Sequence, residues 1–324
     1  MTPPSLLVPG TEHVLIQNLT YLAAVAREGH FGRAAEACHV TQPTLSNGIR
    51  RLEEELGVAL VRRSHRYEGL TPEGERILSW AHRILADADG MRMDVEAMRD
   101  GLAGRLRLGV IPTALPVMTL LSEPLLRRHR AVELSIHSRT SREIEQGLHE
   151  SQLDVGVTYL ENEPLHGVRT LPLYDERYVL LTHAEGRHAG AETVAWSEAA
   201  GERLCLLTPD MQNRRIVDRT FAAAGAHPRP VLETNSISTL YAHVRGGALG
   251  AVMSHTWLHL FPVPEQMRAI PLVEPDVRQP VGLVWLDRKP EPILPRAFIA
   301  AAGTSGMAAL IAESQAGLAG ENPR

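Results

Sequence analysis

Residues 41–57 constrain the fold most, because the sequence marks both the start of a helix and the apolar face that this helix buries. Thr41 can cap a helix, and Pro43 is well placed only in the first turn of one. Apolar residues then recur at spacings of four, three and four, at Leu45, Ile49, Leu52 and Leu56. The spacing predicts a helix over residues 42–56 that buries one face.

The opposite face of this helix carries small polar groups and two guanidinium groups. Its residues are Pro43, Thr44, Ser46, Asn47, Arg50 and Arg51. A helix in a DNA major groove needs small groups near base edges and arginines for phosphates. A solvated surface face has a similar composition, so these residues alone leave both interpretations open.

Short helical patterns at 19–29 and 32–39 precede this helix, and a strand–turn–strand pattern at 58–70 follows it. Three short helices and a small hairpin form the outline of a winged helix-turn-helix. The hairpin carries three basic residues, Arg62, Arg63 and Arg66. A basic hairpin of this kind can reach an adjacent minor groove.

A long helix is predicted from Pro72, because Thr71 can cap it and acids fill its first turn. Apolar residues then step by four and three over more than three heptads, at Ile77, Ala81, Ile84, Ala88, Met91, Val95, Met98 and Leu102. So narrow a seam favours pairing with a second copy of the chain over packing on its own domain. Gly90 weakens the seam.

After Gly101 and Gly104 the pattern changes to alternating strands and helices, which is typical of an α/β fold with a mostly parallel sheet. Strands are predicted at 105–111, 132–137, 153–158, 178–182, 203–208, 231–233, 250–253 and 280–286. Helices are predicted at 115–130, 141–150, 214–224, 238–246 and 294–314. Two linked subdomains of this kind would hold a ligand between them, where helix N-termini present backbone N–H groups.

Composition narrows the class of protein. A length of 324 residues suits two or three domains, and no apolar run approaches the roughly 20 residues that span a membrane. The apolar patch at residues 6–8 lacks the flanks of a signal peptide, so we expect a cytoplasmic protein without a membrane partner. The net charge of −5 does not exclude a DNA partner, because the basic charge that matters is local.

Chemistry-bearing motifs are few. Cys38 and Cys205 fit neither a zinc pattern nor a disulfide scaffold, so structural roles are expected for both. His255 and His259 lie four apart without a third ligand, and we interpret them as packing residues. No nucleophile elbow or phosphate loop is found. The sequence therefore predicts no enzyme, no metal and no cofactor.

Several short sequence motifs occur in the order and spacing of one known family pattern, over some fifty residues. They are Arg33-Ala34-Ala35, Val40 to Ser46, Ile49 to Glu53, Leu56 to Val58, Leu60, Arg63, Arg66 and Leu70 to Gly74. Together they resemble the DNA-binding domain of LysR-type transcriptional regulators. More loosely, Leu153 to Val157 is similar to a strand of that family's effector domain. Glu233 to Ser238 resembles the branch that includes cyanate-responsive regulators.

The resemblance implies an α/β protein overall, whose effector domain is of the periplasmic-binding-protein type. The expected parts are an N-terminal extension (1–16), a winged helix-turn-helix (17–71), a linker and dimerisation helix (72–104), an effector-binding domain (105–317) and a disordered tail (318–324). Within the effector-binding domain we expect one subdomain over about 105–177 and 282–317, and a second over about 178–281.

The surface pattern and the resemblance together give a predicted DNA-binding set. It comprises Arg33, Thr41, Gln42, Pro43, Thr44, Ser46, Asn47, Arg50, Arg51, Arg63 and Arg66. Arg62 departs from the family, because an acid is usual there. Glu68-Gly69 replace a frequently basic pair, and Val61 replaces a common Phe. Gly48, inside the predicted recognition helix, costs about 1 kcal/mol relative to Ala.

The resemblance also places a small ligand between the two subdomains. The predicted effector-binding residues are Thr113, Thr140, Ser141, Thr208, Asn213, Arg214, Asn235 and Ser236. Hydroxyls and amides at helix N-termini complement a carboxylate, and one Arg can add a bidentate clamp. The same hydroxyls also serve as ordinary helix caps. The cyanate-type branch suggests a very small anion such as cyanate or formate.

The expected partners are double-stranded DNA, an anionic effector and a second copy of the chain, with a homotetramer as the family's usual assembly and RNA polymerase as a further candidate. Two alternatives stay open. A redox-responsive regulator of the same family would need a second thiol near Cys205. A small-molecule-binding protein without a DNA function would leave the first hundred residues unexplained.

Overall fold

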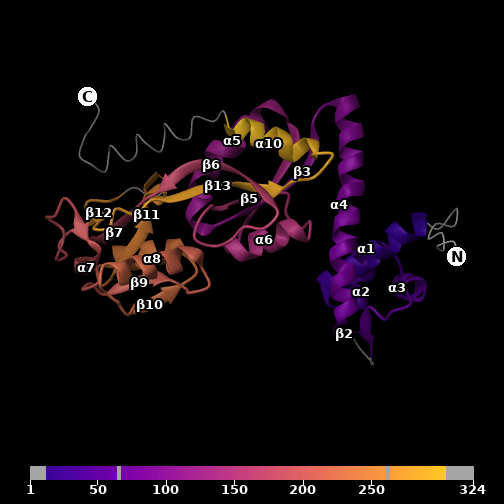
Figure 1. The fold of residues 1–324 in the computed structure, drawn as a ribbon, viewed down its shortest axis with the longest axis horizontal. Coiled ribbons are helices and arrows are strands. Elements are labelled where there is room, and N and C mark those ends of the chain that lie inside the picture. The colour runs from indigo at the N-terminus through magenta and orange to yellow at the C-terminus, as the bar shows by residue number, and fades with distance from the viewer. Residues whose placement is uncertain (1–11, 64–66, 260–262, 304–324) are drawn as a thin grey trace. The chain divides into compact units, whose positions relative to one another are not determined.

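The computed structural model describes residues 12–63, 67–259 and 263–303, and Figure 1 traces them. The chain divides into two compact units. The first holds the described residues up to Arg99 together with His149–Gln152. The second holds the remaining described residues.

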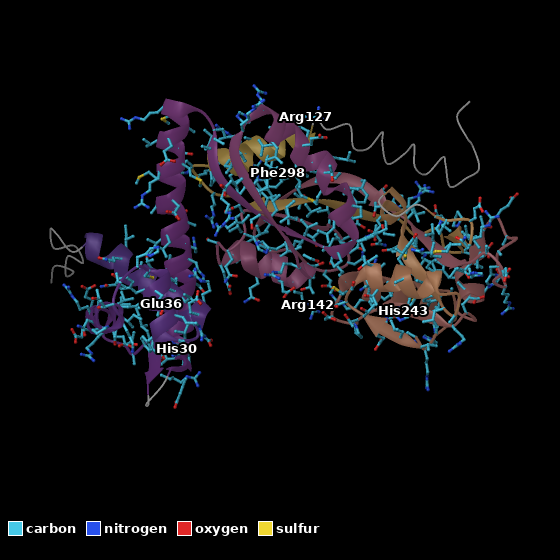
Figure 2. All side chains as sticks on the ribbon, turned by 180° about the vertical axis from the view of Figure 1, so that it is seen from behind. His30, Glu36, Arg127, Arg142, His243 and Phe298 are labelled. Atoms are coloured by element: carbon cyan, nitrogen blue, oxygen red, sulfur yellow. The ribbon has the colours of Figure 1, made fainter. Side chains whose placement is uncertain are left out.

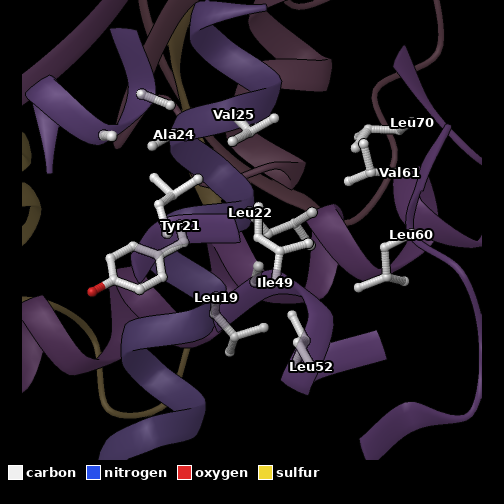
Figure 3. Packing of buried hydrophobic residues seen from close by; sticks show 14 residues of the cluster. Leu19, Tyr21, Leu22, Ala24, Val25, Ile49, Leu52, Leu60, Val61 and Leu70 are labelled. Carbon is white, nitrogen blue, oxygen red and sulfur yellow. The ribbon is translucent and has the colours of Figure 1, made fainter. Parts of the chain in front are cut away.

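The first unit begins with three helices and a two-stranded antiparallel hairpin. These elements are α1 (Glu12–Glu28), α2 (Phe31–Ala37), α3 (Gln42–Leu56), β1 (Val61–Arg63) and β2 (Tyr67–Leu70). Their apolar faces meet in one core, in which Leu22, Ile49 and Leu60 are fully buried (Figure 3). Leu45 and Leu52 are also buried, whereas Leu56, the last residue of the predicted face, is exposed.

Local signals set the ends of these helices. Gly29 and Gly57 adopt positive φ after α1 and α3, the left-handed geometry that ends many helices. His30, labelled in Figure 2, caps α2 because its Nδ1 accepts the Gly32 N–H at 3.0 Å. Thr41 caps α3 as expected.

Gly48 lies where α3 crosses α1. A Cβ atom at this position would lie 2.5 Å from Tyr21 Cδ2 and 2.7 Å from Asn18 Oδ1. Such distances are shorter than van der Waals contact, so the two helices pack this closely only because residue 48 has no side chain. The close crossing explains why a residue that disfavours helix stands inside α3.

The long helix α4 (Pro72–Asp100) follows the hairpin. Thr71 caps it, because its Oγ1 accepts the Gly74 N–H at 2.9 Å while donating to the Ala59 carbonyl at 2.7 Å. Part of the predicted apolar seam is open to solvent. Met91, Val95 and Met98 are 66%, 49% and 82% exposed, whereas Ala81 joins the core of the first unit. Leu102 lies beyond the helix.

The second unit contains two sheets. The first sheet has the order β4-β3-β5-β13-β6. Its strands are β3 (Ala103–Val110), β4 (Ala131–Ser138), β5 (Val155–Tyr159), β6 (Val168–Glu176) and β13 (Gln279–Leu286), accompanied by η1 (Pro112–Val117), α5 (Met118–Arg128), α6 (Ser141–His149) and α10 (Ile293–Gly303). Phe298 of α10 is fully buried where this helix packs against α5 (Figure 2).

The second sheet has the order β10-β9-β11-β7-β12-β8. Its strands are β7 (Tyr178–His183), β8 (Val194–Ala195), β9 (Leu204–Leu207), β10 (Leu232–Thr234), β11 (Gly250–Ser254) and β12 (Met267–Val273), accompanied by α7 (Trp196–Ala199), α8 (Gln212–Ala223), α9 (Ile237–Arg245) and η2 (His255–His259). The chain crosses between the sheets at Arg177 and again at residues 274–278.

The α/β class is confirmed, but the sheets are mixed: four of their nine strand pairs are antiparallel, so the expectation of mostly parallel sheets holds only narrowly. β3 is parallel to β4 and β5, and β9 is parallel to β10 and β11. β13 and β7 run antiparallel to both of their neighbours. The return crossing brings β13 back into the first sheet in the opposite direction, and the first crossing leads into β7, which runs antiparallel to both of its neighbours in the second sheet.

Several helices and strands of the structure were not predicted from the sequence. β6, β8, β12 and α7 were not predicted, and the helix expected over 115–130 consists of η1 followed by α5. Pro271 interrupts the strand pattern of β12, and Pro116 falls inside the expected helix. The predicted N-terminal extension lies largely outside the described residues, as do the end of the closing helix, the tail and Arg66.

Candidate functional site

The outward face of α3 is polar and exposed. Gln42, Pro43, Thr44, Asn47, Arg50 and Arg51 are exposed, and Ser46 is half-buried. Arg50 and Arg51 make no hydrogen bond or ion pair with any residue that the structure describes. Their guanidinium groups are therefore available for phosphates or base edges on a helix held firmly by its buried side.

Two members of the predicted DNA-binding set have structural roles. Thr41 Oγ1 lies 2.8 Å from Thr44 Oγ1 and accepts the Thr44 N–H at 3.4 Å, so it caps α3. Arg33 donates from Nη2 to the Glu28 carbonyl, tying α2 to the end of α1. Both residues thereby help to hold the three helices together.

Side chains of the first unit also fix the hairpin. Glu53 of α3 accepts the backbone N–H groups of Leu60 and Val61 at 2.9 and 3.1 Å. Arg62 donates from Nε to the Leu70 carbonyl at 2.8 Å, across the hairpin. The hairpin is thus attached directly to α3, and Arg63 ends its first strand.

A second candidate site lies between the two sheets of the second unit. The first sheet contributes Thr113, Thr140, Ser141 and Tyr159, and the second contributes Leu207, Met211, Gln212 and Asn213, with Ile111 and Pro112 completing the cleft. Its volume is about 10 Å³, close to the smallest that admits one water molecule. The cleft is therefore closed.

A buried polar network forms the floor of this cleft. Tyr159 donates its hydroxyl to Glu176 Oε1 at 2.6 Å, and its oxygen accepts Asn213 Nδ2 at 3.0 Å. Asn213 Nδ2 also lies 3.4 Å from Glu176 Oε1, and Thr113 Oγ1 is 3.1 Å from the Tyr159 hydroxyl. The network joins residues of both sheets at the end of β6, beside the first crossing.

Glu176 is fully buried within this network. Burial raises the pKa of its carboxyl above the usual 4.5, while hydrogen bonds, above all from Tyr159, oppose that rise. Burial and the nearby Glu176 charge raise the pKa of Tyr159 well above 10, so the phenol keeps its proton and can donate it in the short hydrogen bond. The cleft floor therefore holds one acid whose surroundings disfavour its charge.

Other hydroxyls around the cleft differ in their use. Thr140 forms a capping box at the start of α6, because its Oγ1 accepts the Glu143 N–H at 3.2 Å and its own N–H donates to Glu143 Oε2 at 2.8 Å. Ser141 Oγ and Thr208 Oγ1 are buried and have no hydrogen-bond partner among the described residues. Ser141 lines the cleft directly.

The remaining predicted effector residues do not line the closed cleft. Arg214 is 8% exposed and donates to Asp218 at 2.8 Å, and to Glu233 Oε1 and the Leu207 carbonyl at 2.6 Å each. Its guanidinium is thus engaged within the second sheet and is not a free clamp. Ser236 caps α9, and Asn235 is exposed.

Sequence reasoning missed Tyr159, Glu176, Met211 and Gln212 at this site. Tyr159 follows directly after the predicted strand 153–158, and strand ends in α/β sheets commonly line ligand sites, which was a usable signal. Glu176 carried no signal, because β6 was not predicted and its role depends on burial.

No described helix is long and apolar enough to cross a membrane. Among the residues that the structure describes, no group of three His, Cys, Asp or Glu side chains is arranged to hold a metal ion. His255 and His259 lie in η2, and His255 Nδ1 accepts the Arg177 N–H at 3.1 Å, a structural hydrogen bond. The side chain of His259 lies outside the described residues.

Comparison with known families agrees with this geometry. Residues 16–75 match the bacterial regulatory helix-turn-helix protein, lysR family, and residues 99–305 match the LysR substrate binding domain. The DNA-binding transcriptional dual regulator OxyR of Escherichia coli K12 is 30% identical over 281 residues, which is 85% of this chain and 90% of that protein.

Solved structures give the same result. A full-length OxyR variant from Pseudomonas aeruginosa superposes with a TM-score of 0.74 at 28% identity, covering 91% of this chain and 96% of that one. Full-length CbnR complexed with its target DNA has a TM-score of 0.65 at 23% identity, covering 90% and 99%, and so supports the fold. The family matches cover residues 16–75 and 99–305, and the chain therefore belongs to the LysR family of DNA-binding transcription regulators.

Proposed function

We propose that this regulator binds double-stranded DNA through the exposed face of α3 and the β1–β2 hairpin, with residues 17–71 as the reading head. The observation that carries the proposal is the pair of unpartnered guanidinium groups, Arg50 and Arg51, on a helix whose other side is buried. The hydrogen bonds that Glu53 accepts from the backbone N–H groups of Leu60 and Val61 support a rigid placement of both elements.

Arg50→Ala tests this interface. Operator fragments are first selected from a random DNA library with the full chain, and the affinity of the variant is then measured over a series of salt concentrations. A lost phosphate contact weakens binding at every salt concentration and lowers the salt slope by about 1. The control is Arg127→Ala, which removes the same charge from α5. An unchanged affinity and slope for Arg50→Ala would remove this residue from the interface.

We also propose that a small anionic effector, such as a short carboxylate, binds between the two sheets. Support comes from the unpartnered Ser141 Oγ, the N-termini of α6 and α8 beside it, and a lining drawn from both sheets. Because the closed cleft has no room for such an anion, the sheets must first separate about the crossings at Arg177 and 274–278. Binding would then favour the open arrangement.

The cyanate-type resemblance at Glu233–Ser238 adds little to this proposal. Glu233 pairs with Arg214, and the segment does not line the cleft. We therefore keep the class of effector at small carboxylates and related anions, with cyanate and formate as members to be tested.

A thermal-shift series on the full chain tests the cleft with formate, cyanate, acetate and pyruvate. A ligand of the folded state raises the melting temperature, and Ser141→Ala should reduce that rise. The control is Ser138→Ala, which removes a hydroxyl from the exposed end of β4. An equal rise in all three proteins would show that the ligand binds elsewhere.

A redox response is the second candidate, because several relatives carry the name hydrogen peroxide-inducible genes activator. The residues of this chain argue against it. Cys205 is fully buried in β9, its Sγ lies 3.4 Å from the Gly250 carbonyl, and burial raises its pKa to about 11. Burial also raises the pKa of Cys38. Because the thiolate is the reactive form, neither thiol is poised to react with peroxide.

The exposed apolar seam of α4 supports a proposal for the assembly. We propose that this seam pairs with a second copy, that two dimers form a tetramer as the family resemblance implies, and that the regulator works in the cytoplasm, where RNA polymerase is a further candidate partner.

A further inference from the structure

A second cavity, of about 620 Å³, lies in the second unit and shares no lining residue with the cleft. Its walls come from the start of β7, from β12, from the segment 189–193 that precedes β8, and from residues 276–277 at the return crossing. Figure 1 shows β7, β12 and α7 near one another at the left of the view, and β12 and β8 end the second sheet beside β7. The cavity is large enough for a small organic molecule.

Two arginines line this cavity without a partner. The backbone of Arg177 is fixed, because its N–H donates to His255 Nδ1 at 3.1 Å and its carbonyl accepts the His255 N–H at 3.0 Å. Its guanidinium makes no hydrogen bond or ion pair with any described residue, and its Nε is buried. Arg268 of β12 is likewise unpartnered within the described chain, but it is exposed. A buried, unsatisfied donor on a charged group is costly, and an anion would satisfy it.

The acids of the cavity do not supply that anion. Asp276 is held by Arg278, whose Nε and Nη2 lie 3.2 and 3.1 Å from Asp276 Oδ2. Glu192 is exposed on the segment 189–193. The two arginines therefore have no acidic partner within the cavity.

The rest of the lining is apolar. Val179, Ile270, Leu272 and Val277 contribute aliphatic surface. Trp196 is fully buried and fixed edge-on between two rings, with centroids 5.7 Å from Tyr178 and 5.0 Å from Phe221. Arginines with apolar walls suit a ligand that has one anionic group on a hydrocarbon body.

We propose that this cavity is a second ligand site, which binds a monocarboxylate with an apolar body, such as a medium-chain fatty acid. This proposal does not rest on the effector proposed for the cleft. Arg177 directly follows Glu176 at the first crossing between the sheets. A carboxylate bound to Arg177 would therefore change the contacts of the crossing about which the cleft must open. The two sites would then be coupled through this crossing.

Isothermal titration of the full chain with octanoate tests the proposal, with octan-1-ol as the neutral probe. We expect octanoate to bind at one site per chain and octan-1-ol to bind at least tenfold more weakly, since a charge-assisted hydrogen bond contributes enough for a tenfold change. Arg268→Ala should weaken octanoate binding about tenfold. Gly190 lines the cavity and nothing lies within 4 Å of a Cβ added there, so Gly190→Phe, whose ring would compete with the ligand for this space, should abolish binding.

Two controls separate this site from the cleft. Arg229→Ala removes an exposed arginine outside the cavity and should leave octanoate binding unchanged. Ser141→Ala alters the cleft and should also leave it unchanged. Circular dichroism melting checks that each variant is folded. Absence of octanoate binding, full binding by folded Gly190→Phe, equal binding of octan-1-ol, or loss of binding in Ser141→Ala would each overturn the proposal, and the last result would assign octanoate to the cleft.

Discussion

At the scale of single residues, the structure explains why a glycine stands inside the helix α3. Gly48 disfavours helix formation, and nothing in the sequence shows what it gains in return. The crossing of α1 and α3 supplies the reason, because a methyl group would meet Tyr21 and Asn18. Glu176 is the opposite case. Its surroundings, all distant in sequence except Tyr174 and Tyr178, give it a role that no local pattern carries.

Gly48→Ala should therefore destabilise the protein. Helix propensity favours alanine by about 1 kcal/mol, but overpacking costs about 1–3 kcal/mol. The free energy of unfolding of the first unit, measured in urea, should therefore fall by up to about 2 kcal/mol. The control is Gly90→Ala in α4, where nothing lies within 4 Å of the added methyl group and stability should rise. A gain for Gly48→Ala would show that α1 moves away at no cost.

At the scale of elements, the sequence predicts well those helices and strands whose limits are set by nearby residues, and it misses those that depend on contacts far along the chain. The helix α3 spans the predicted residues, because Thr41, Pro43 and Gly57 mark its ends locally. The predicted strands that became β7, β9 and β11 are short apolar runs with buried cores. β6 was missed because its exposed and buried positions mix polar and apolar residues, and β8 because it has two residues. Thr113, Thr140, Ser141 and Asn213 were predicted and do line the cleft.

The apolar seam of α4 gives a prediction at this scale. Val95→Glu places a charge among exposed apolar residues, so it should shift the full chain toward smaller species in size-exclusion chromatography with light scattering, because a charge in a helix–helix seam is costly. Ser79→Glu adds the same charge to an exposed position of α4 outside the seam and should leave the mass unchanged. If both variants keep the wild-type mass, α4 is not the dimer interface.

At the scale of the whole second unit, side-chain bonds join the two subdomains at several points. Thr256 in η2 is fully buried and donates its Oγ1 to the Thr113 carbonyl in η1 at 2.9 Å, a direct bond between the subdomains. The Tyr159–Glu176–Asn213 network is another connection. Gln212 also donates from Nε2 to the Glu161 carbonyl at 3.0 Å, and Arg215 Nε lies 2.6 Å from Glu163 Oε1. Several of these groups line the cleft, so groups that close it also hold the arrangement of the sheets.

Thr256→Val should favour the open arrangement. Removing one hydrogen bond costs about 1 kcal/mol, which raises the open population about fivefold. Faster hydrogen exchange at the amides of η1 would report this opening. Thr220→Val, which loses a hydroxyl bonded within α8, is the matched control. Equal exchange in both variants would mean that the Thr256 bond does not restrain the sheets.

If the proposed effector binds in this cleft, its closed arrangement also limits how fast the regulator responds. If a ligand enters only after the sheets part, the observed rate of association cannot rise indefinitely with ligand concentration. It levels off at the rate of opening, a property of the protein alone. The apparent affinity is likewise the intrinsic affinity scaled by the open fraction. A variant that loosens the Thr256 bond would then respond faster and at lower effector concentration without any change in the groups that touch the ligand.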